Sequence, residues 1–422
     1  MLDIRFIREH RNSVKEGVLK KGEDASKVDE VIRVDERRRQ LMQQSEALKS
    51  RKNAVSGQVA QMKGKKEDAS AIIAEMKVVA NQIKVLEGEL REVEEALQSL
   101  LLQIPNLPHS SVPVGKSPDE NQVIATWGEP FLIDFSPKPH WELAEKLHIV
   151  DFARGTKITG AGYPVYLGKG AQLERAMVNF FLDEASANGY TEMFPPLLVN
   201  ATSATGTGQL PDKEDQMYVV PSDELYLVPT AEVPVTNFYR DEILAERQLP
   251  IKFSAYTPCF RREAGSYGKD VRGLNRVHQF NKIELVKFVH PDKSYEELES
   301  LRHDAERVLQ KLGLQYHVLL MCSGEMGFTQ AKKYDLEVWS VGQQKWLEVS
   351  SISNFESYQA QRMNIRFRPE GGGKPDIVHT LNGSALALPR VMAALLEHYQ
   401  TPEGKVVIPK VLHEYTGFEV IG

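Results

Sequence analysis

The sequence is poor in several residue types, and each scarcity narrows what the protein can be. The first 104 of its 422 residues contain no proline, and Phe6 is their only aromatic residue. Long helices have this composition, whereas a globular core needs more aromatic side chains. Two cysteines, Cys259 and Cys322, cannot form a disulfide framework and leave too few ligands for a typical zinc site, so we expect no zinc. No run of 18 apolar residues exists, which predicts that no segment spans a membrane.

Charge and the first residues suggest a cytoplasmic protein but leave its partner open. The first ten residues mix acids with bases and lack an apolar stretch, so we expect neither a signal nor a transit peptide. Lys and Arg number 52 against 58 Asp and Glu, a net charge of −6. Taken alone, this disfavours a nucleic-acid partner, because phosphate binding needs concentrated positive charge. A total hides local fields, however, so nucleic acid is not excluded.

Apolar residues recur at coiled-coil spacing along two arms of the first region. In the first arm they recur every seven residues, at Val34, Leu41, Leu48, Val55 and Met62. In the second arm they step alternately by four and three, at Ile72, Met76, Val79, Ile83, Leu86, Leu90, Val93, Leu97, Leu100 and Ile104. A glycine within the charged run at 63–68 indicates a turn between the arms. Residues 1–104 are therefore predicted to form a domain built on an antiparallel helical hairpin, a coiled coil.

Charge is divided unequally between these arms. Residues 31–66 carry ten basic and three acidic side chains, whereas residues 67–104 carry eight acidic and three basic ones. One interpretation is that the arms pair through their opposite charges. Another is that a basic face on the first arm also lies along a phosphate backbone. This segment alone leaves both interpretations open.

The rest of the chain has the composition of a globular domain. Prolines and a polar stretch predict a linker at 105–120, followed by a mixed domain at 121–422. Residues 170–188 have the spacing of an amphipathic helix, and the strand after them runs into Pro195 and Pro196. Because proline donates no hydrogen bond to a sheet ladder, this strand is expected at a sheet edge or a subunit boundary.

A basic loop joins two strands expected at 255–261 and 277–286. In and beside the loop lie Arg261, Arg262, Glu263, Lys269, Arg272 and Arg276. Arginine suits phosphate because its planar fork donates two parallel hydrogen bonds. Glycines at 265, 268 and 273 would let a ligand approach the backbone. Neither a P-loop nor a dinucleotide-binding glycine motif is present, so a phosphate site here needs another explanation, and a solvated surface loop is the competing interpretation.

Three motifs, in order, resemble those of the class II aminoacyl-tRNA synthetases. The helix and the proline-ended strand are similar to the first motif, residues 260–263 and 276–280 to the second, and residues 379–390 with the amphipathic helix after them to the third. Segments at 206–211, 230–232 and 353–356 narrow the resemblance to the seryl-tRNA synthetases of bacterial type, over the whole chain. The resemblance implies an α+β fold, in which the hairpin is followed by a class II synthetase domain built on a mixed, mainly antiparallel β-sheet with flanking helices.

The resemblance also implies an enzyme that activates serine with ATP and magnesium to seryl-adenylate and passes the seryl group to a tRNA. The catalytic residues that it implies are Arg261, Glu348 and Arg390. The ATP contacts that it implies are Arg261, Arg262, Glu263, Val277, Phe280, Glu348, Val349, Ser350, Ser351 and Arg390. Arg261 matches the arginine that grips the α-phosphate, and Glu263 would accept a hydrogen bond from the amino group of adenine. Glu348 and Ser351 match the pair that holds magnesium, an ion that prefers oxygen ligands.

For serine, the residues that the resemblance implies lie at eight positions. They are Thr230, Ala231, Glu232, Arg261, Glu284, Thr380, Asn382 and Ser384. The two glutamates would neutralise the ammonium group. A polar group paired with the hydroxyl, with Thr380 as a candidate, would reject alanine, because an analogue without the hydroxyl leaves buried polar groups unpaired.

The partners implied are tRNA(Ser), with tRNA(Sec) left open, L-serine, and a second copy of the chain in a homodimer with tRNA bound across the two subunits. The tRNA contacts predicted on the hairpin are Arg33, Arg37, Lys49, Arg51, Lys52, Lys63, Lys65 and Lys66. Two other functions compete with this one. A serine-adenylating paralogue that loads a protein carrier would be expected to lose the long hairpin, and a non-catalytic scaffold would be expected to lose the ATP residues.

Overall fold

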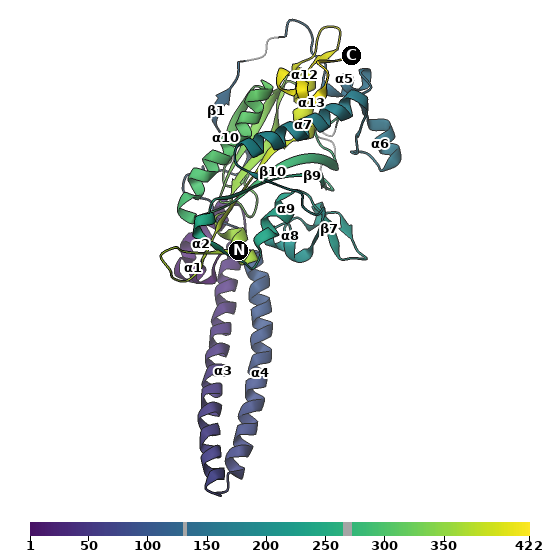
Figure 1. Cartoon of the computed structure of the whole chain (residues 1–422). Helices are drawn as coiled ribbons and strands as arrows, with labels where there is room; N and C mark the ends of the chain where they lie inside the picture. The colour runs from purple at the N-terminus through teal and green to yellow at the C-terminus, as the bar shows by residue number, and fades with distance from the viewer. Residues whose placement is uncertain (130–132, 265–271) are drawn as a thin grey trace. The chain divides into compact units, whose positions relative to one another are not determined.

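The computed structural model describes residues 1–129, 133–264 and 272–422 (Figure 1). Contacts divide these residues into two compact units, Met1–Pro105 and Asn106–Gly422. Three loop positions singled out above, Gly265, Gly268 and Lys269, lie outside the described residues. No helix within the described ranges is long and apolar enough to cross a membrane.

The first unit is built on a hairpin of two long helices, α3 (Ser26–Gly64) and α4 (Ser70–Leu102), as Figure 1 shows. Two short helices precede them, α1 (Ile4–Glu9) and α2 (Arg11–Lys20). Val79, Ile83 and Leu97 of the predicted seam are buried, whereas the apolar residues Val78 and Val85 outside it are exposed. The helical hairpin, its turn and its seam are thus confirmed, because the 4–3 spacing keeps one face of α4 against α3.

An eight-stranded sheet forms the centre of the second unit (Figure 1). Its strands, in spatial order, are β1 (Gln122–Trp127), β11 (Tyr316–Leu320), β12 (Lys332–Ser340), β13 (Lys345–Asn354), β16 (His379–Ala387), β10 (Gln279–Val289), β9 (Ile251–Phe260) and β4 (Thr191–Met193). Neighbouring strands are antiparallel except β4 and β9, which are parallel. The predicted mixed, mainly antiparallel sheet is therefore confirmed.

Helices and smaller sheets surround this sheet. The longer helices are α7 (Gly168–Ala187), α10 (Ser294–Leu312) and α12 (Leu388–His398). Shorter helices are α5 (His140–Lys146), α6 (Phe152–Ile158), α8 (Ala201–Thr207), α9 (Glu232–Thr236), α11 (Tyr358–Met363) and α13 (His413–Thr416). Two small sheets have two strands each: β2 (Val150–Asp151) with β3 (Val165–Tyr166), and β17 (Val406–Val407) with β18 (Val420–Ile421). Two others have three strands each, in the order β5 (Leu198–Asn200), β7 (Leu225–Leu227), β6 (Val219–Val220) and in the order β15 (Asp376–Ile377), β14 (Arg366–Arg368), β8 (Ile243–Ala245).

The two faces of the sheet have different surroundings, and strand β10 makes the difference plain. Successive side chains of a strand point to opposite faces. Ile283 and Leu285 lie in the main hydrophobic core with residues of α7, α10 and α12. Lys282 and Glu284 point the other way and line a cavity, and Phe288 further along that face joins a second apolar cluster with residues of α9 and α11. The helix-covered face therefore holds the core, and the opposite face holds the cavity.

The predicted helix at 170–188 corresponds to α7, and the strand after it, β4, lies at the edge of the sheet. Phe194, which follows β4, is 84% exposed. The amphipathic helix predicted after residue 390 corresponds to α12, but it has no broad exposed face. Almost every residue of α12 is buried, because the helix packs against the sheet on one side and against α5 and α7 on others. The expected linker is not a free segment either, since the Asn106 amide donates hydrogen bonds to the backbone oxygens of Thr329 and Phe355.

Candidate active site

A cavity of about 530 Å³ opens on the face of the sheet opposite the main core, entirely within the second unit. It brings together most of the predicted serine and ATP positions, which lie up to 160 residues apart in the sequence. The predicted residues that line it are Thr230, Glu232, Arg261, Glu263, Val277, Phe280, Glu284, Glu348, Val349, Ser350, Ser351, Asn382, Ser384 and Arg390. Three predicted residues do not line it: Ala231 and Thr380 are buried beside it, and Arg262 is exposed outside it.

One end of the cavity is organised around the Glu284 carboxylate on β10. The Thr230 hydroxyl donates to Oε2 at 3.0 Å, and the Asn382 amide donates to Oε1 at 2.7 Å. Lys282, two residues away on the same face of the strand, forms an ion pair with the same carboxylate. All of these side chains are buried, so each oxygen of Glu284 has a partner although it has little contact with water.

A second carboxylate, Glu232, lies at the same end, and hydrogen bonds from residues outside the cavity lining hold it in place. The Gln359 amide donates to its Oε1 at 2.7 Å, and the Thr380 hydroxyl donates to the Gln359 oxygen at 2.8 Å. Burial, together with the nearby charge of Glu284, raises the pKa of Glu232 to about 7. Thr380 therefore acts on the cavity through Gln359 rather than facing it.

Arg261 and Phe280 meet where β9 and β10 open into the loop. The guanidinium carbon of Arg261 lies 5.2 Å from the centre of the Phe280 ring, and its Nε donates to the backbone oxygen of Pro229 at 3.2 Å. Glu263 forms an ion pair with Arg276 through its Oε2, at 2.8 Å, so one oxygen of its carboxylate is paired with a protein cation. Arg262 instead lies over the ring of Tyr218. This end of the cavity thus offers an arginine and a half-buried aromatic ring side by side, a combination that suits an anion next to a flat ring.

Arg390, in the first turn of α12, is fixed by backbone acceptors. Its Nε donates to the Asn275 oxygen at 2.9 Å and its Nη1 to the Glu348 oxygen at 2.7 Å. The Glu348 carboxylate lies 3.7 Å from the same Nη1. Partial burial opposes ionisation of Glu348, but the charges of Lys333, Arg390 and further cavity cations outweigh it and lower its pKa. Glu348 therefore stays a carboxylate at neutral pH.

The described residues contain no group of three or more His, Cys, Asp or Glu side chains that could hold a metal ion by themselves. Glu348 and Ser351 nevertheless line the cavity on the same strand, β13, and an ionised carboxylate beside a hydroxyl suits a hard cation that takes its other ligands from a phosphate. The residues present thus fit a shared magnesium site rather than a closed one.

Several cavity residues were missed from sequence, among them Lys213, Lys282 and Lys333. Lys282 could have been found, because it lies between Phe280 and Glu284 at the spacing of one strand face. Lys333, at the start of β12, forms an ion pair with Asp335 at 2.9 Å and has no sequence signal of its own. With Arg261, Arg276 and Arg390, these lysines give the cavity six basic side chains, a strong field for phosphate groups.

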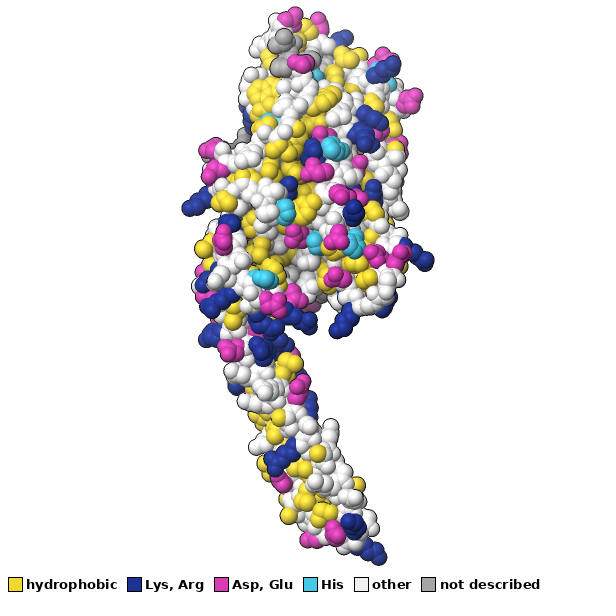
Figure 2. Space-filling view, turned by 90° about the vertical axis from the view of Figure 1, so that its left-hand side faces the viewer, with side chains coloured by type: hydrophobic (Ala, Val, Ile, Leu, Met, Phe, Trp, Pro, Cys, Tyr) yellow, Lys and Arg dark blue, Asp and Glu magenta, His cyan; other side chains and the backbone are white. Residues whose placement is uncertain are grey.

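The basic residues of the hairpin separate into two sets. Arg37 pairs with Glu89 at 2.8 Å, Lys49 with Glu87 at 2.7 Å, and Arg51 with Glu75, all across to α4. Pairing between the arms therefore accounts for these three, while Arg33 pairs with Glu30 of its own helix. The other four predicted contacts, Lys52, Lys63, Lys65 and Lys66, are exposed and form no ion pair with any described residue. Figure 2 shows Lys and Arg side chains at the tip of the hairpin, where the last three of these lie.

Comparison with known proteins identifies the family of both units. A family model of the seryl-tRNA synthetase N-terminal domain matches residues 1–108, and the class II core domain of tRNA synthetases (G, H, P, S and T) matches residues 218–399. A protein of Salinibacter ruber named serine–tRNA ligase is 54% identical over the whole chain and 99% of its own length. The chain belongs to the seryl-tRNA synthetase family.

Solved structures of this family have the same fold. The seryl-tRNA synthetase of Pyrococcus horikoshii, complexed with ATP, superposes with a TM-score of 0.94 at 37% identity and covers 100% of this chain and 99% of its own. The cytoplasmic serine–tRNA ligase of Naegleria fowleri, in complex with AMP, superposes with a TM-score of 0.89 at 28% identity over 100% of this chain and 98% of its own. The predicted family and fold are thereby confirmed.

Proposed function

We propose that this chain activates L-serine with ATP to seryl-adenylate and transfers the seryl group to tRNA(Ser). The observation that carries the proposal is the cavity itself, which joins a polar end centred on Glu284 to a basic end with Arg261 and Arg390. Serine and an adenine nucleotide need these two environments next to each other. The alternative of a carrier-loading paralogue is disfavoured by the intact hairpin and by full-length relatives named serine–tRNA ligase.

At the serine end, Glu232 and Glu284 would neutralise the ammonium group. Thr230, Asn382 and Ser384 supply the polar groups around it, and Asn382 and Thr230 already hold Glu284 in place. Removing the serine hydroxyl would leave one of these buried groups without a partner, which explains how alanine is rejected. Thr380 supports the site through Gln359.

At the ATP end, Arg261 would bind the α-phosphate and the serine carboxylate, and its guanidinium would stabilise the charge that develops as the carboxylate attacks. Phe280 would stack on adenine, and Arg390 would hold the terminal phosphate. Glu348 and Ser351 would hold a magnesium ion, which supplies positive charge to the phosphates when bound. Glu263, whose Oε2 is paired with Arg276, would accept from the amino group of adenine through its other oxygen.

For tRNA we propose that the unpaired lysines of the hairpin, Lys52, Lys63, Lys65 and Lys66, contact the phosphate backbone. Recognition through backbone and shape suits double-stranded RNA, because its deep groove hides the base edges. Arg33, Arg37, Lys49 and Arg51 remain predicted contacts whose charges are shared with glutamates. Use of tRNA(Sec) is a further proposal, and charging of both tRNAs by the same preparation would test it.

We also propose a cytoplasmic homodimer. The exposed Phe194 beside edge strand β4 supports it, since a monomer gains nothing from an aromatic ring in water at a sheet edge. Sedimentation would show a dimer for the unmodified chain and a monomer for Phe194→Asp. A chain that sediments as a monomer would contradict the proposal.

Serine-dependent exchange of pyrophosphate into ATP, followed by charging of purified tRNA(Ser), tests the function. We expect both reactions. Exchange without charging would favour the carrier-loading paralogue. If no exchange is detected, both enzyme functions are excluded. Arg261→Ala should abolish most of the exchange, whereas Arg262→Ala, at the exposed neighbour outside the cavity, should retain most of it.

A further inference from the structure

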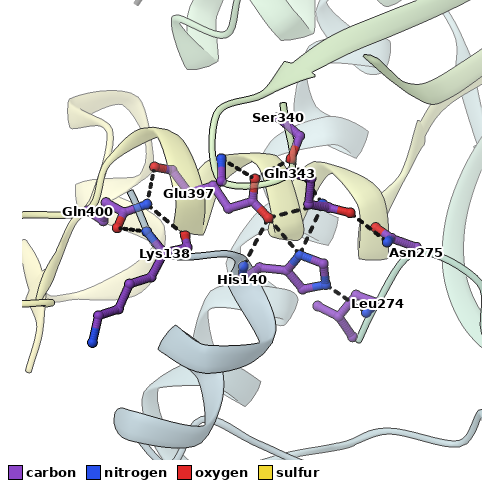
Figure 3. Close-up of polar contacts among 9 residues, drawn as sticks. Lys138, His140, Leu274, Asn275, Ser340, Gln343, Glu397 and Gln400 are labelled. Atoms are coloured by element: carbon purple, nitrogen blue, oxygen red, sulfur yellow. Dashed lines mark hydrogen bonds and ion pairs between the residues drawn. The ribbon is translucent and has the colours of Figure 1, made fainter. Parts of the chain in front are cut away.

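A buried polar network lies behind the ATP end of the cavity and is centred on His140 and Glu397 (Figure 3). His140 begins α5, and Glu397 lies in the last turn of α12. Both side chains are fully buried, and His140 Nδ1 lies 2.8 Å from Glu397 Oε1. None of the predicted site residues belongs to this pair, and neither residue lines the cavity.

The Glu397 carboxylate is saturated with donors. Oε1 accepts hydrogen bonds from the backbone N–H of His140 at 2.9 Å and from the Gln343 amide at 3.0 Å, besides His140 Nδ1. Oε2 accepts from the Ser340 hydroxyl and from the backbone N–H of Gly342. Although burial opposes ionisation, the hydrogen bonds from His140 and Ser340 keep the pKa of Glu397 below its ordinary value. A permanent carboxylate therefore fixes the orientation of the imidazole.

The other ring nitrogen of His140 faces the cavity wall. Because Nδ1 donates to Glu397, Nε2 carries the free lone pair, and it accepts the backbone N–H of Leu274 at 2.9 Å. Gly273 precedes this contact with φ +69°, and a Cβ there would lie 2.2 Å from Nε2. The close approach of ring and backbone thus requires glycine at this position.

The contacted segment, residues 272–277, is the wall of the ATP end, and we call it the 272–277 limb. Leu274 and Asn275 line the cavity. Gln343, itself bound to Glu397, accepts from the Asn275 amide at 2.7 Å, so the network holds the limb at two adjacent residues. The Asn275 backbone oxygen in turn accepts from Arg390 Nε at 2.9 Å. The path from Glu397 through His140 and the limb therefore ends on the arginine assigned to ATP.

We propose that His140, oriented by Glu397, is a positioning residue for ATP binding: it anchors the 272–277 limb and, through the Asn275 oxygen, sets the orientation of Arg390. The proposal rests on the proposed role of Arg390. It assigns no contact between His140 and ATP. Its consequence is selective, because the hydrogen bonds that hold Glu232 and Glu284 at the serine end come from Thr230, Gln359 and Asn382, and the His140 network shares none of them.

Two substitutions of His140 test its two side-chain hydrogen bonds one at a time. His140→Asn places an amide near the Nδ1 position and keeps the donor to Glu397, but it loses the acceptor for Leu274. His140→Gln reaches the Nε2 position and keeps that acceptor. We expect H140N to raise the KM for ATP in pyrophosphate exchange about five- to tenfold, a factor typical of one lost hydrogen bond, with the KM for serine changed less than twofold. H140Q should restore the KM for ATP to within twofold of the unmodified value.

Matched controls keep the test decisive. Ser340→Ala removes a donor to Glu397 and an acceptor for Gln343 but leaves both hydrogen bonds to the limb in place, so it should lower the melting temperature and change the KM for ATP much less than H140N does. Equal KM changes for ATP and serine in H140N, or equal effects of H140N and H140Q on ATP, would overturn the proposal. If H140N does not fold, Gln343→Met removes the second tether and must raise the KM for ATP alone, otherwise the proposal is wrong. Arg390→Ala is the reference: if it leaves the KM for ATP unchanged, the proposed role of Arg390 fails first.

Discussion

Glu232 is a cavity carboxyl group whose charge changes near neutral pH. Burial and the neighbouring Glu284 raise its pKa to about 7, so it is largely neutral below that pH. Serine brings an ammonium group that favours the carboxylate, so binding below pH 7 must first release a proton. We therefore expect the KM for serine to rise about tenfold per pH unit as the pH falls below 7. The measurement is pyrophosphate exchange between pH 5.5 and 8.5 with saturating ATP.

A substitution of Gln359 tests the direction in which the pH midpoint should move. The hydrogen bond from Gln359 lowers the pKa of Glu232, so Gln359→Met should raise it and move the midpoint of the profile to higher pH. A KM for serine that is constant from pH 6 to pH 8 would show that Glu232 does not meet the ammonium group.

Glu348 gives a prediction about magnesium. Cavity cations lower its pKa, so it offers a full negative charge at neutral pH. Glu348→Gln keeps the size and removes the charge, and we expect about a tenfold higher magnesium concentration for half-maximal exchange. Glu325→Gln, at another carboxylate of the same cavity, is the matched control and should shift this concentration much less. Equal shifts would remove Glu348 from the metal site.

At the scale of elements, the hairpin carries two kinds of basic residue: those paired with glutamates of α4 and the exposed lysines at its tip. Replacing Lys63, Lys65 and Lys66 with serine should weaken tRNA binding and reduce the slope of log affinity against log salt by about 0.7 to 1 per lost phosphate contact. Replacing Arg37, Lys49 and Arg51 removes charges that glutamates already share, so the slope should change less while the hairpin loses some stability. Filter binding across a salt series distinguishes the two triple variants. Identical slopes would argue against a phosphate contact at the tip.

Elements with a repeating pattern could be predicted from sequence, whereas contacts between distant segments could not. The seam of α4 follows from spacing alone, and Glu284 and Asn382 follow from motifs that resemble a known family. Lys333 has no pattern around it, and no sequence signal indicates that His140 and Glu397, 257 positions apart, meet. The burial of α12 was also missed. Its polar residues Arg390 and Glu397 suggest a side exposed to water, but Arg390 binds the cavity wall and Glu397 binds His140.

For the whole molecule, the two units predict two separable activities. The cavity lies entirely within the second unit, and the hairpin belongs to the first. Replacing residues 31–104 with a short flexible linker should leave pyrophosphate exchange within about twofold. Charging of tRNA should fall on the order of a hundredfold, because the phosphate contacts that dominate affinity are removed. If charging by the shortened enzyme remained normal, the hairpin would not be the tRNA-binding element.

The alternation along β10 divides mutational damage into two kinds. Ile283 and Leu285 belong to the core, whereas Phe280, Lys282 and Glu284 belong to the cavity. A polar substitution at the first pair removes apolar contacts that hold the domain together, so cells would contain less of the enzyme. Substitutions at the second group remove contacts to the substrates, so each molecule loses activity. From Lys282 to Leu285, loss of specific activity and loss of abundance should therefore alternate with the period of the strand itself.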